Sequence, residues 1–322
     1  MKRLTMSLGA LAVAAAPLVH GDQVAVDASI GAYSKTSGVT GNINSVGSDT
    51  MNNLMTFWGE TFQKLYPNVK IQVEGKGSST APPALIAGTS QFGPMSRAMK
   101  PTEIDQFEQK YGYKPTQIRT AVDALGVFVN KDNPLASLSL EQLDAVFSKA
   151  RRRGAAKQIA TWDDAGLTGE WAGKPISLYG RNSASGTYSF FKEHVLKNGD
   201  YRDDVKEQPG SAAVVRAVAT DRFAVGYSGI GYATSGVRAI SLAEKTGEKA
   251  VAPSAENSYS GDYPLARFLF VYINRAPGKA LDPLVREFTR LILSKEGQEI
   301  VVKDGYYPIL ASVATEDLKK VE

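Results

Sequence analysis

The stretch RTAVDALGVFVN, at Arg119–Asn130, is a run of β-forming residues about twice as long as an average strand. A second long run, PLARFLFVYIN, lies at Pro264–Asn274. Elsewhere, short strand-like segments alternate with helical patterns, which predicts an α/β fold with largely parallel sheets. We expect the two long runs to cross between two lobes, so that one lobe is built from both ends of the chain.

The length of 322 residues supports this division, because a domain commonly has about 100–200 residues. Hydrophobic residues make up 43% of the chain, which is enough for a sizeable core. We expect the first lobe to comprise residues 22–120 and 268–322, and the second lobe to comprise residues 121–267. A cleft between two such lobes is a natural site for a small ligand.

Residues 1–21 have the pattern of a secretory signal peptide. Lys2 and Arg3 precede the short apolar run Leu4–Ala16, and cleavage is expected near Gly21–Asp22. The apolar run is shorter than the ~20 residues that span a bilayer, and an uncleaved membrane anchor is the alternative. The absence of cysteine fits an exported chain that folds without disulfides, so we expect a periplasmic protein.

The composition excludes several classes of site. Without cysteine, and with only His20 and His194, the chain lacks the residues for a zinc-thiolate or histidine metal site, and we expect no cofactor. Loss of residues 1–21 lowers the formal charge from +4 to +2 by removing one lysine and one arginine. Arg151–Arg153 is then the one basic cluster, which disfavours nucleic-acid binding.

Three segments share one design, in which a strand is followed by a small polar turn and then by a helix. They are VGSDT at Val46–Thr50, GKGSST at Gly75–Thr80 and GRNSASGT at Gly180–Thr187. A helix N-terminus exposes unpaired N–H groups and a partial positive charge, which favours anion binding. Glycine lets the backbone approach a ligand closely, and serine and threonine hydroxyls add donors.

Arg181, in the third turn, adds a guanidinium that can form charge-assisted hydrogen bonds to an oxyanion. If the three turns met across a cleft, their donors would surround a small tetrahedral anion. The alternative for each turn is an ordinary helix N-cap. A fourth segment, FGPMSR at Phe92–Arg97, indicates by itself a turn with a solvated arginine.

These segments resemble the phosphate-binding proteins of ABC phosphate importers. The resemblance extends from about Ile43 to Val313, and it rests on VGSDT, GKGSST followed by QFGPMSR, TWDD, GRNSASGT and VGYSGIGY. It implies a two-lobed periplasmic-binding-protein fold, similar to type II, with the ligand cleft between the lobes. In the family, backbone amides, hydroxyls and one arginine bind phosphate at the hinge.

The resemblance also implies which residues bind phosphate. Carried over by position, they are Ser48, Asp49, Thr50, Ser78, Ser96, Arg97, Arg181, Ser185, Gly186 and Thr187. The implied partners are inorganic phosphate and, transiently, an ABC permease in the inner membrane. The protein is expected to be a monomer without catalytic residues.

Two positions depart from the family's pattern. Many members have an aspartate at the position of Ser96, where its carboxylate accepts the proton of phosphate and repels sulfate. Asp49 is the expected replacement, because it lies in the first turn beside the expected anion. Ser183 stands where an acidic partner of the arginine often occurs, which predicts that Arg181 is less neutralised in this chain.

Two other functions are compatible with the sequence. The same fold could bind another tetrahedral oxyanion, such as sulfate, molybdate or a phosphonate. A secreted phosphatase would use Ser48 or Ser185 as its nucleophile, but it would lack a metal cluster and a suitable base. His194 lies two helical turns beyond Thr187 and is poorly placed for that role. Saturable binding of phosphate, without hydrolysis of a phosphate ester, would favour a binding protein over a phosphatase.

Overall fold

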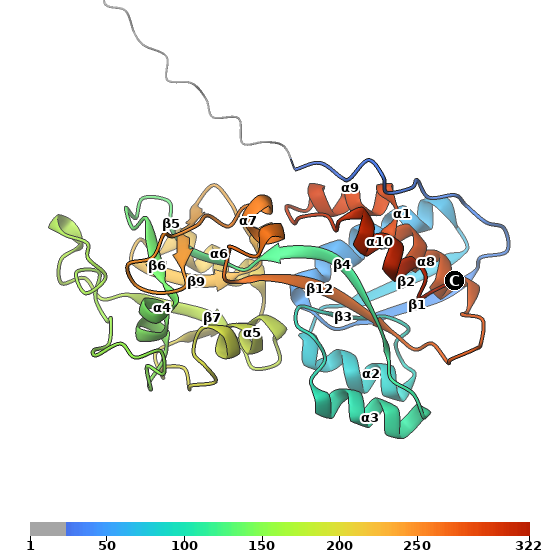
Figure 1. The fold of residues 1–322 in the computed structure, drawn as a ribbon, viewed down its shortest axis with the longest axis horizontal. Coiled ribbons are helices and arrows are strands. Elements are labelled where there is room, and N and C mark those ends of the chain that lie inside the picture. The colour runs from blue at the N-terminus through green and yellow to red at the C-terminus, as the bar shows by residue number, and fades with distance from the viewer. Residues whose placement is uncertain (1–23) are drawn as a thin grey trace, which may run out of the picture.

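Two lobes lie side by side and are joined by a pair of long strands in the computed structural model of this chain (Figure 1). The structure describes residues 24–322, so the predicted signal peptide, residues 1–21, lies outside the described residues. We call the lobe that contains both ends of the described chain the terminal lobe, and the other the central lobe. Among the described residues, no helix has the length and apolar character needed to cross a membrane.

The terminal lobe packs helices around two small sheets. Strand β1 pairs in parallel with β2, and β3 pairs with the joining strand β12. Its elements are β1 (Gly41–Val46), η1 (Asp49–Met51), α1 (Asn52–Leu65), β2 (Val69–Glu74), η2 (Ser78–Thr80), α2 (Ala81–Ala87), β3 (Gly93–Met95), α3 (Pro101–Tyr111), α8 (Pro283–Leu293), α9 (Lys295–Lys303) and α10 (Ala311–Leu318).

The central lobe is built on a five-stranded sheet with the order β10-β5-β9-β7-β8. A two-stranded parallel sheet, β6 with β11, lies beside it. The elements of this lobe are β5 (Gly126–Asn130), β6 (Ser137–Ser139), α4 (Leu140–Phe147), η3 (Gly169–Trp171), β7 (Ser177–Arg181), α5 (Gly186–His194), β8 (Lys206–Gln208), α6 (Ser211–Thr220), β9 (Ala224–Ser228), η4 (Ile230–Tyr232), β10 (Val237–Ala239), β11 (Ser241–Ala243) and α7 (Ala255–Ser260).

Strands β4 (Thr116–Ala124) and β12 (Ala266–Ile273) form the connection between the lobes (Figure 1). They pair antiparallel over their whole length, from Ala266 opposite Ala124 to Ile273 opposite Thr116. The long run predicted at 119–130 is divided at Leu125, because β4 belongs to the joining sheet and β5 to the central-lobe sheet. The two crossing runs therefore lie against each other.

The expectation of largely parallel sheets is wrong. The three-stranded sheet β3-β12-β4 is antiparallel throughout, and β5 is antiparallel to both β9 and β10. For β4 and β12 the physical reason is the double crossing: one run enters the central lobe and the other returns from it, so the two point in opposite directions. Parallel pairs remain where a helix connects two strands, as in β1–β2.

Each lobe has its own large hydrophobic cluster. In the terminal lobe, Leu54, Trp58 and Phe62 of α1 are fully buried at the helical spacing that the sequence predicts. In the central lobe, the corresponding core joins β5 and β7 to α4 and α5, with Phe147 and Phe191 in edge-to-face contact. Two separate cores can move relative to each other about the strands that join them.

Candidate functional site

The three predicted turns meet between the lobes. The first two turns belong to the terminal lobe and the third to the central lobe. Thr50 Oγ1 lies 2.9 Å from Thr187 Oγ1 across the junction, and both side chains are buried. The amide of Ser79 also donates to the carbonyl oxygen of Ala184 at 3.1 Å. The lobes are therefore in contact at the turns that the sequence assigns to anion binding.

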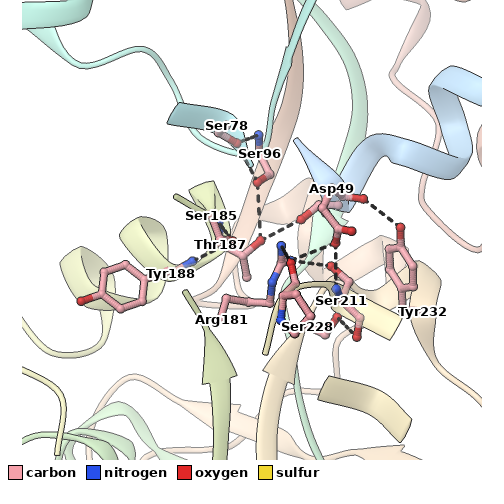
Figure 2. A network of polar contacts seen from close by, with 12 residues as sticks. Asp49, Ser78, Ser96, Arg181, Ser185, Thr187, Tyr188, Ser211, Ser228 and Tyr232 are labelled. Atoms are coloured by element: carbon pink, nitrogen blue, oxygen red, sulfur yellow. Dashed lines mark hydrogen bonds and ion pairs between the residues drawn. The ribbon is translucent and has the colours of Figure 1, made fainter. Parts of the chain in front are cut away.

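A cluster of buried hydroxyls marks the centre of this junction (Figure 2). Ser78 Oγ lies 3.3 Å from Ser96 Oγ, and Ser96 Oγ lies 3.5 Å from Thr187 Oγ1. All three residues are 0% exposed. The fourth segment thus joins the other three, and it does so through Ser96 rather than through its arginine. Hydroxyls are both donors and acceptors, so this cluster can turn its protons toward an anion.

Glycine is required at position 186 by this close approach. A Cβ at Gly186 would lie 2.3 Å from Ser78 Oγ and 2.7 Å from Ser96 Oγ. Distances below 3.0 Å are essentially never seen for a real Cβ, so with any other residue Ser78 and Ser96 would have to shift before the lobes could meet in this way. Gly186 is the first residue of α5, and it brings that helix N-terminus against the terminal lobe.

Ser185 is an N-cap, as the alternative interpretation of the turns proposed. Its Oγ accepts hydrogen bonds from the amides of Thr187 at 3.1 Å and Tyr188 at 3.3 Å. The hydroxyl proton of Ser185 is not used in these two bonds, because the oxygen is the acceptor in both. In the first turn, Ser48 forms no side-chain cap, and its amide donates to the carbonyl oxygen of Pro94.

Arg181 is held at the junction by both lobes (Figure 2). Its Nη1 donates to Ser211 Oγ at 2.7 Å and lies 3.2 Å from Asp49 Oδ2. The same carboxylate oxygen accepts the amide of Ser211 at 2.7 Å, at the N-terminus of α6. The prediction from Ser183 that Arg181 is less neutralised is wrong, because Asp49, from the other lobe, supplies the acidic partner.

The arginine is almost entirely enclosed. Arg181 is 1% exposed, and burial lowers its pKa from the usual value, while Asp49 opposes that shift. Its Nε is buried and has no hydrogen-bond partner in the described part of the chain. A buried donor without a partner costs free energy, so a ligand that accepts a hydrogen bond from this Nε would be favoured. An oxyanion is a ligand of this kind.

Arg97 differs from the expectation for its segment. It is 7% exposed rather than solvated, because Nη1 and Nη2 each donate at 2.7 Å to the carboxylate of Glu103, in the first turn of α3. A further contact, at 3.4 Å, reaches Ser79 Oγ. The charge of Arg97 is thus paired inside the terminal lobe, beside the hydroxyl cluster.

Sequence reasoning missed several residues of the junction. Ser211 begins α6 after a strand and a glycine, which is the same strand–turn–helix pattern as the three predicted turns. Tyr232 donates to the carbonyl oxygen of Asp49 at 2.9 Å, and burial raises its pKa. Arg267 and Asp123 form a buried ion pair in the joining strands. The available signal for that pair was the presence of charged residues in otherwise apolar strands.

Comparison with known proteins agrees with this geometry. A family model described as a PBP superfamily domain matches residues 32–296. The chain is 53% identical over 323 aligned residues to "Phosphate-binding protein PstS" of Pseudomonas aeruginosa, and the alignment covers 100% of this chain and 99% of that protein. This chain belongs to the PstS family of phosphate-binding proteins.

Solved structures show the same two-lobed fold. A protein from Clostridium perfringens whose structure contains bound phosphate has a TM-score of 0.70 at 24% identity, and the match covers 84% of this chain and all of that one. An ABC-type phosphate transport receptor from Vibrio cholerae has a TM-score of 0.65 at 22% identity, with 83% of this chain and all of that one covered. The predicted fold class, a two-lobed α/β binding protein, is confirmed.

Proposed function

We propose that this chain binds inorganic phosphate between its two lobes in the periplasm and delivers it to the permease of an ABC importer. The observation that carries the proposal is the meeting of buried hydroxyls from both lobes beside the enclosed guanidinium of Arg181. Membership of the PstS family supports the choice of anion. We assign phosphate contacts to nine of the ten predicted residues. The tenth, Arg97, is assigned a supporting role, because its guanidinium contacts Glu103 and Ser79.

The lobes provide the basis for a transport cycle. We propose the division at residues 22–120 with 268–322, and 121–267, as expected from the sequence. A ligand that receives hydrogen bonds from both lobes favours the arrangement in which they touch. Each hydrogen bond to a charged group contributes about 1.5–3 kcal/mol, so several of them support tight binding. The permease can then distinguish the loaded protein from the empty one by whether the two lobes are in contact. A single chain contains both lobes, so a monomer is sufficient for this role.

A phosphatase is the less supported alternative. A serine nucleophile needs a base within hydrogen-bonding reach. His194 is the last residue of α5 and is exposed, with its ring stacked on Phe190 at 4.0 Å between centroids. Its Nδ1 lies 3.0 Å from the carbonyl oxygen of Phe190. This placement favours binding without turnover.

Selectivity against sulfate depends, in this proposal, on Asp49. Phosphate carries a proton at neutral pH and sulfate does not. A carboxylate at the site can accept a hydrogen bond from that proton. It repels a fully ionised anion, which has no proton to donate to the carboxylate. Asp49 lies beside the guanidinium to which the anion is proposed to bind, since its Oδ2 is 3.2 Å from Arg181 Nη1.

Asp49→Asn should lower the ratio of phosphate to sulfate affinity by about tenfold or more. The amide keeps the size of the side chain but carries no negative charge that repels sulfate, and its NH2 group can donate a hydrogen bond to a fully ionised oxyanion. The measurement is calorimetric titration of the mature protein, freed of bound anion by unfolding and refolding, with phosphate and then with sulfate. The wild type should bind one phosphate tightly and sulfate weakly.

Asp203→Asn is the matched control, because it removes the same charge from a side chain that is 89% exposed. It should leave both affinities unchanged. Comparable binding of sulfate and phosphate by the wild type would contradict the choice of anion, and release of phosphate from a chromogenic ester would favour the phosphatase. An unchanged ratio in Asp49→Asn would remove Asp49 from the explanation of selectivity.

A further inference from the structure

A buried ion pair crosses the joining strands directly beneath the hydroxyl cluster. Arg267 on β12 and Asp123 on β4 are opposite each other in the strand register. Arg267 Nε and Nη2 donate to Asp123 Oδ2 at 3.0 and 2.8 Å, and the two side chains are 3% and 0% exposed. Burying two charges is expensive, and apolar residues of similar size would often be as stable. Stability alone therefore does not account for the pair.

The pair contacts both lobes. Arg267 Nη1 donates to the carbonyl oxygen of Ser96, in the terminal lobe, at 2.8 Å. Its Nη2 donates to Thr187 Oγ1, in the central lobe, at 3.0 Å. Asp123 Oδ1 accepts the amide of Ile230, also in the central lobe, at 2.9 Å. The guanidinium thus joins two segments of the candidate site from a strand that belongs to the connection between the lobes.

The bond to Thr187 determines how that hydroxyl can act. Arginine has donors and no acceptor, so Thr187 Oγ1 must accept in this contact. The hydroxyl proton of Thr187 is then free for another partner. The neighbouring hydroxyl oxygens are Thr50 Oγ1 at 2.9 Å and Ser96 Oγ at 3.5 Å. A hydroxyl that accepts a hydrogen bond from a charged donor is polarised by it. The hydrogen bond that the hydroxyl then donates with its own proton becomes stronger.

We propose that Arg267, held by Asp123, is a positioning residue that orients the Thr187 hydroxyl as a donor to the bound anion and ties this orientation to contact between the lobes. This inference rests on the proposed function, because it assigns a role at the same phosphate site. Arg267 increases affinity through Thr187, whereas Arg181 acts beside Asp49. Arg267 is thus a second positive charge that favours anion binding, without contacting the anion itself.

The test compares Arg267→Met with Thr187→Val and with the double variant, by calorimetric titration with phosphate. Arg267→Met keeps the volume of the side chain and should weaken phosphate binding by about tenfold to a hundredfold. If Arg267 acts through Thr187, the double variant should bind little more weakly than Thr187→Val alone. Arg267→Lys keeps the positive charge but lacks the planar guanidinium that reaches Asp123, Ser96 and Thr187 together, so it should give an intermediate affinity. It replaces Arg267→Met in the test if that variant does not fold.

Arg119→Met is the matched control, because Arg119 also lies on a joining strand and pairs with the buried carboxylate of Asp317 at 2.8 Å. It should lower the melting temperature while phosphate affinity stays within about twofold of the wild type. Losses that add fully in the double variant, or wild-type affinity in Arg267→Met, would overturn the positioning role while leaving phosphate binding intact. Absence of phosphate binding by the wild type would overturn the proposed function and this inference together.

Discussion

Arg181→Gln should weaken phosphate binding by about a hundredfold to a thousandfold. The substitution removes the guanidinium donors of Arg181, including the buried Nε that has no partner in the described chain. It also leaves the carboxylate of Asp49, now 3.2 Å from Nη1, without its positive neighbour. An unpaired carboxylate then repels the incoming anion, so two effects act in the same direction.

Calorimetric titration with phosphate measures this loss, and thermal unfolding of the anion-free protein reports separately on the fold. Arg238→Gln is the matched control, because Arg238 lies on β10 and donates to the carbonyl oxygen of Asn133 rather than to the junction. It should keep the wild-type affinity. If Arg181→Gln bound phosphate within about threefold of the wild type, the guanidinium would not be the main charged ligand.

Gly186→Ala should abolish tight phosphate binding without destabilising the anion-free protein. The added Cβ would lie 2.3 Å from Ser78 Oγ when the lobes touch, so the arrangement that holds the anion becomes inaccessible. When the lobes are apart the clash is absent, and alanine is the better helix former by about 1 kcal/mol at an ordinary helical position. We expect a loss of affinity of a hundredfold or more together with an unchanged or higher melting temperature.

The two readouts of Gly186→Ala are a phosphate titration and a thermal melt of the same preparation. Gly31→Ala is the control, because a Cβ at Gly31 would meet nothing within 4 Å. It should change neither the affinity nor the unfolding temperature appreciably. Tight phosphate binding by Gly186→Ala would show that closure in the form described here is not needed to hold the anion.

The strand–turn–helix segments were predictable because their signals are local. Small polar residues between an apolar strand and a helical pattern specify the turn, whatever the rest of the chain does. The two crossing runs were predictable for the same reason, since each is a long uninterrupted β-rich sequence. Their antiparallel pairing is not a property of either run alone, but it follows once both runs are recognised as crossings of the same boundary.

The ion pairs of the site could not be assigned from the sequence. The ion pair of Arg267 with Asp123 joins residues 144 apart in the sequence, and the hydrogen bond from the Ser211 amide to Asp49 joins residues 162 apart. A charged residue in an apolar strand indicates that a partner exists, but the spacing along the chain does not identify it. The association of Arg181 with Asp49 likewise depends on how the lobes meet. The chemical types of the ligands were thus predictable, and their partners were not.

A crystal structure of the mature protein with phosphate would locate the anion. We expect one phosphate between the lobes, with its oxygens about 3 Å from the hydroxyls of Ser96 and Thr187 and from the guanidinium of Arg181. Crystals of Arg181→Gln, soaked at a phosphate concentration just sufficient to fill the wild type, should lack the anion. A phosphate bound elsewhere, or a wild-type junction that remains without anion in excess phosphate, would show that these turns are not the phosphate site.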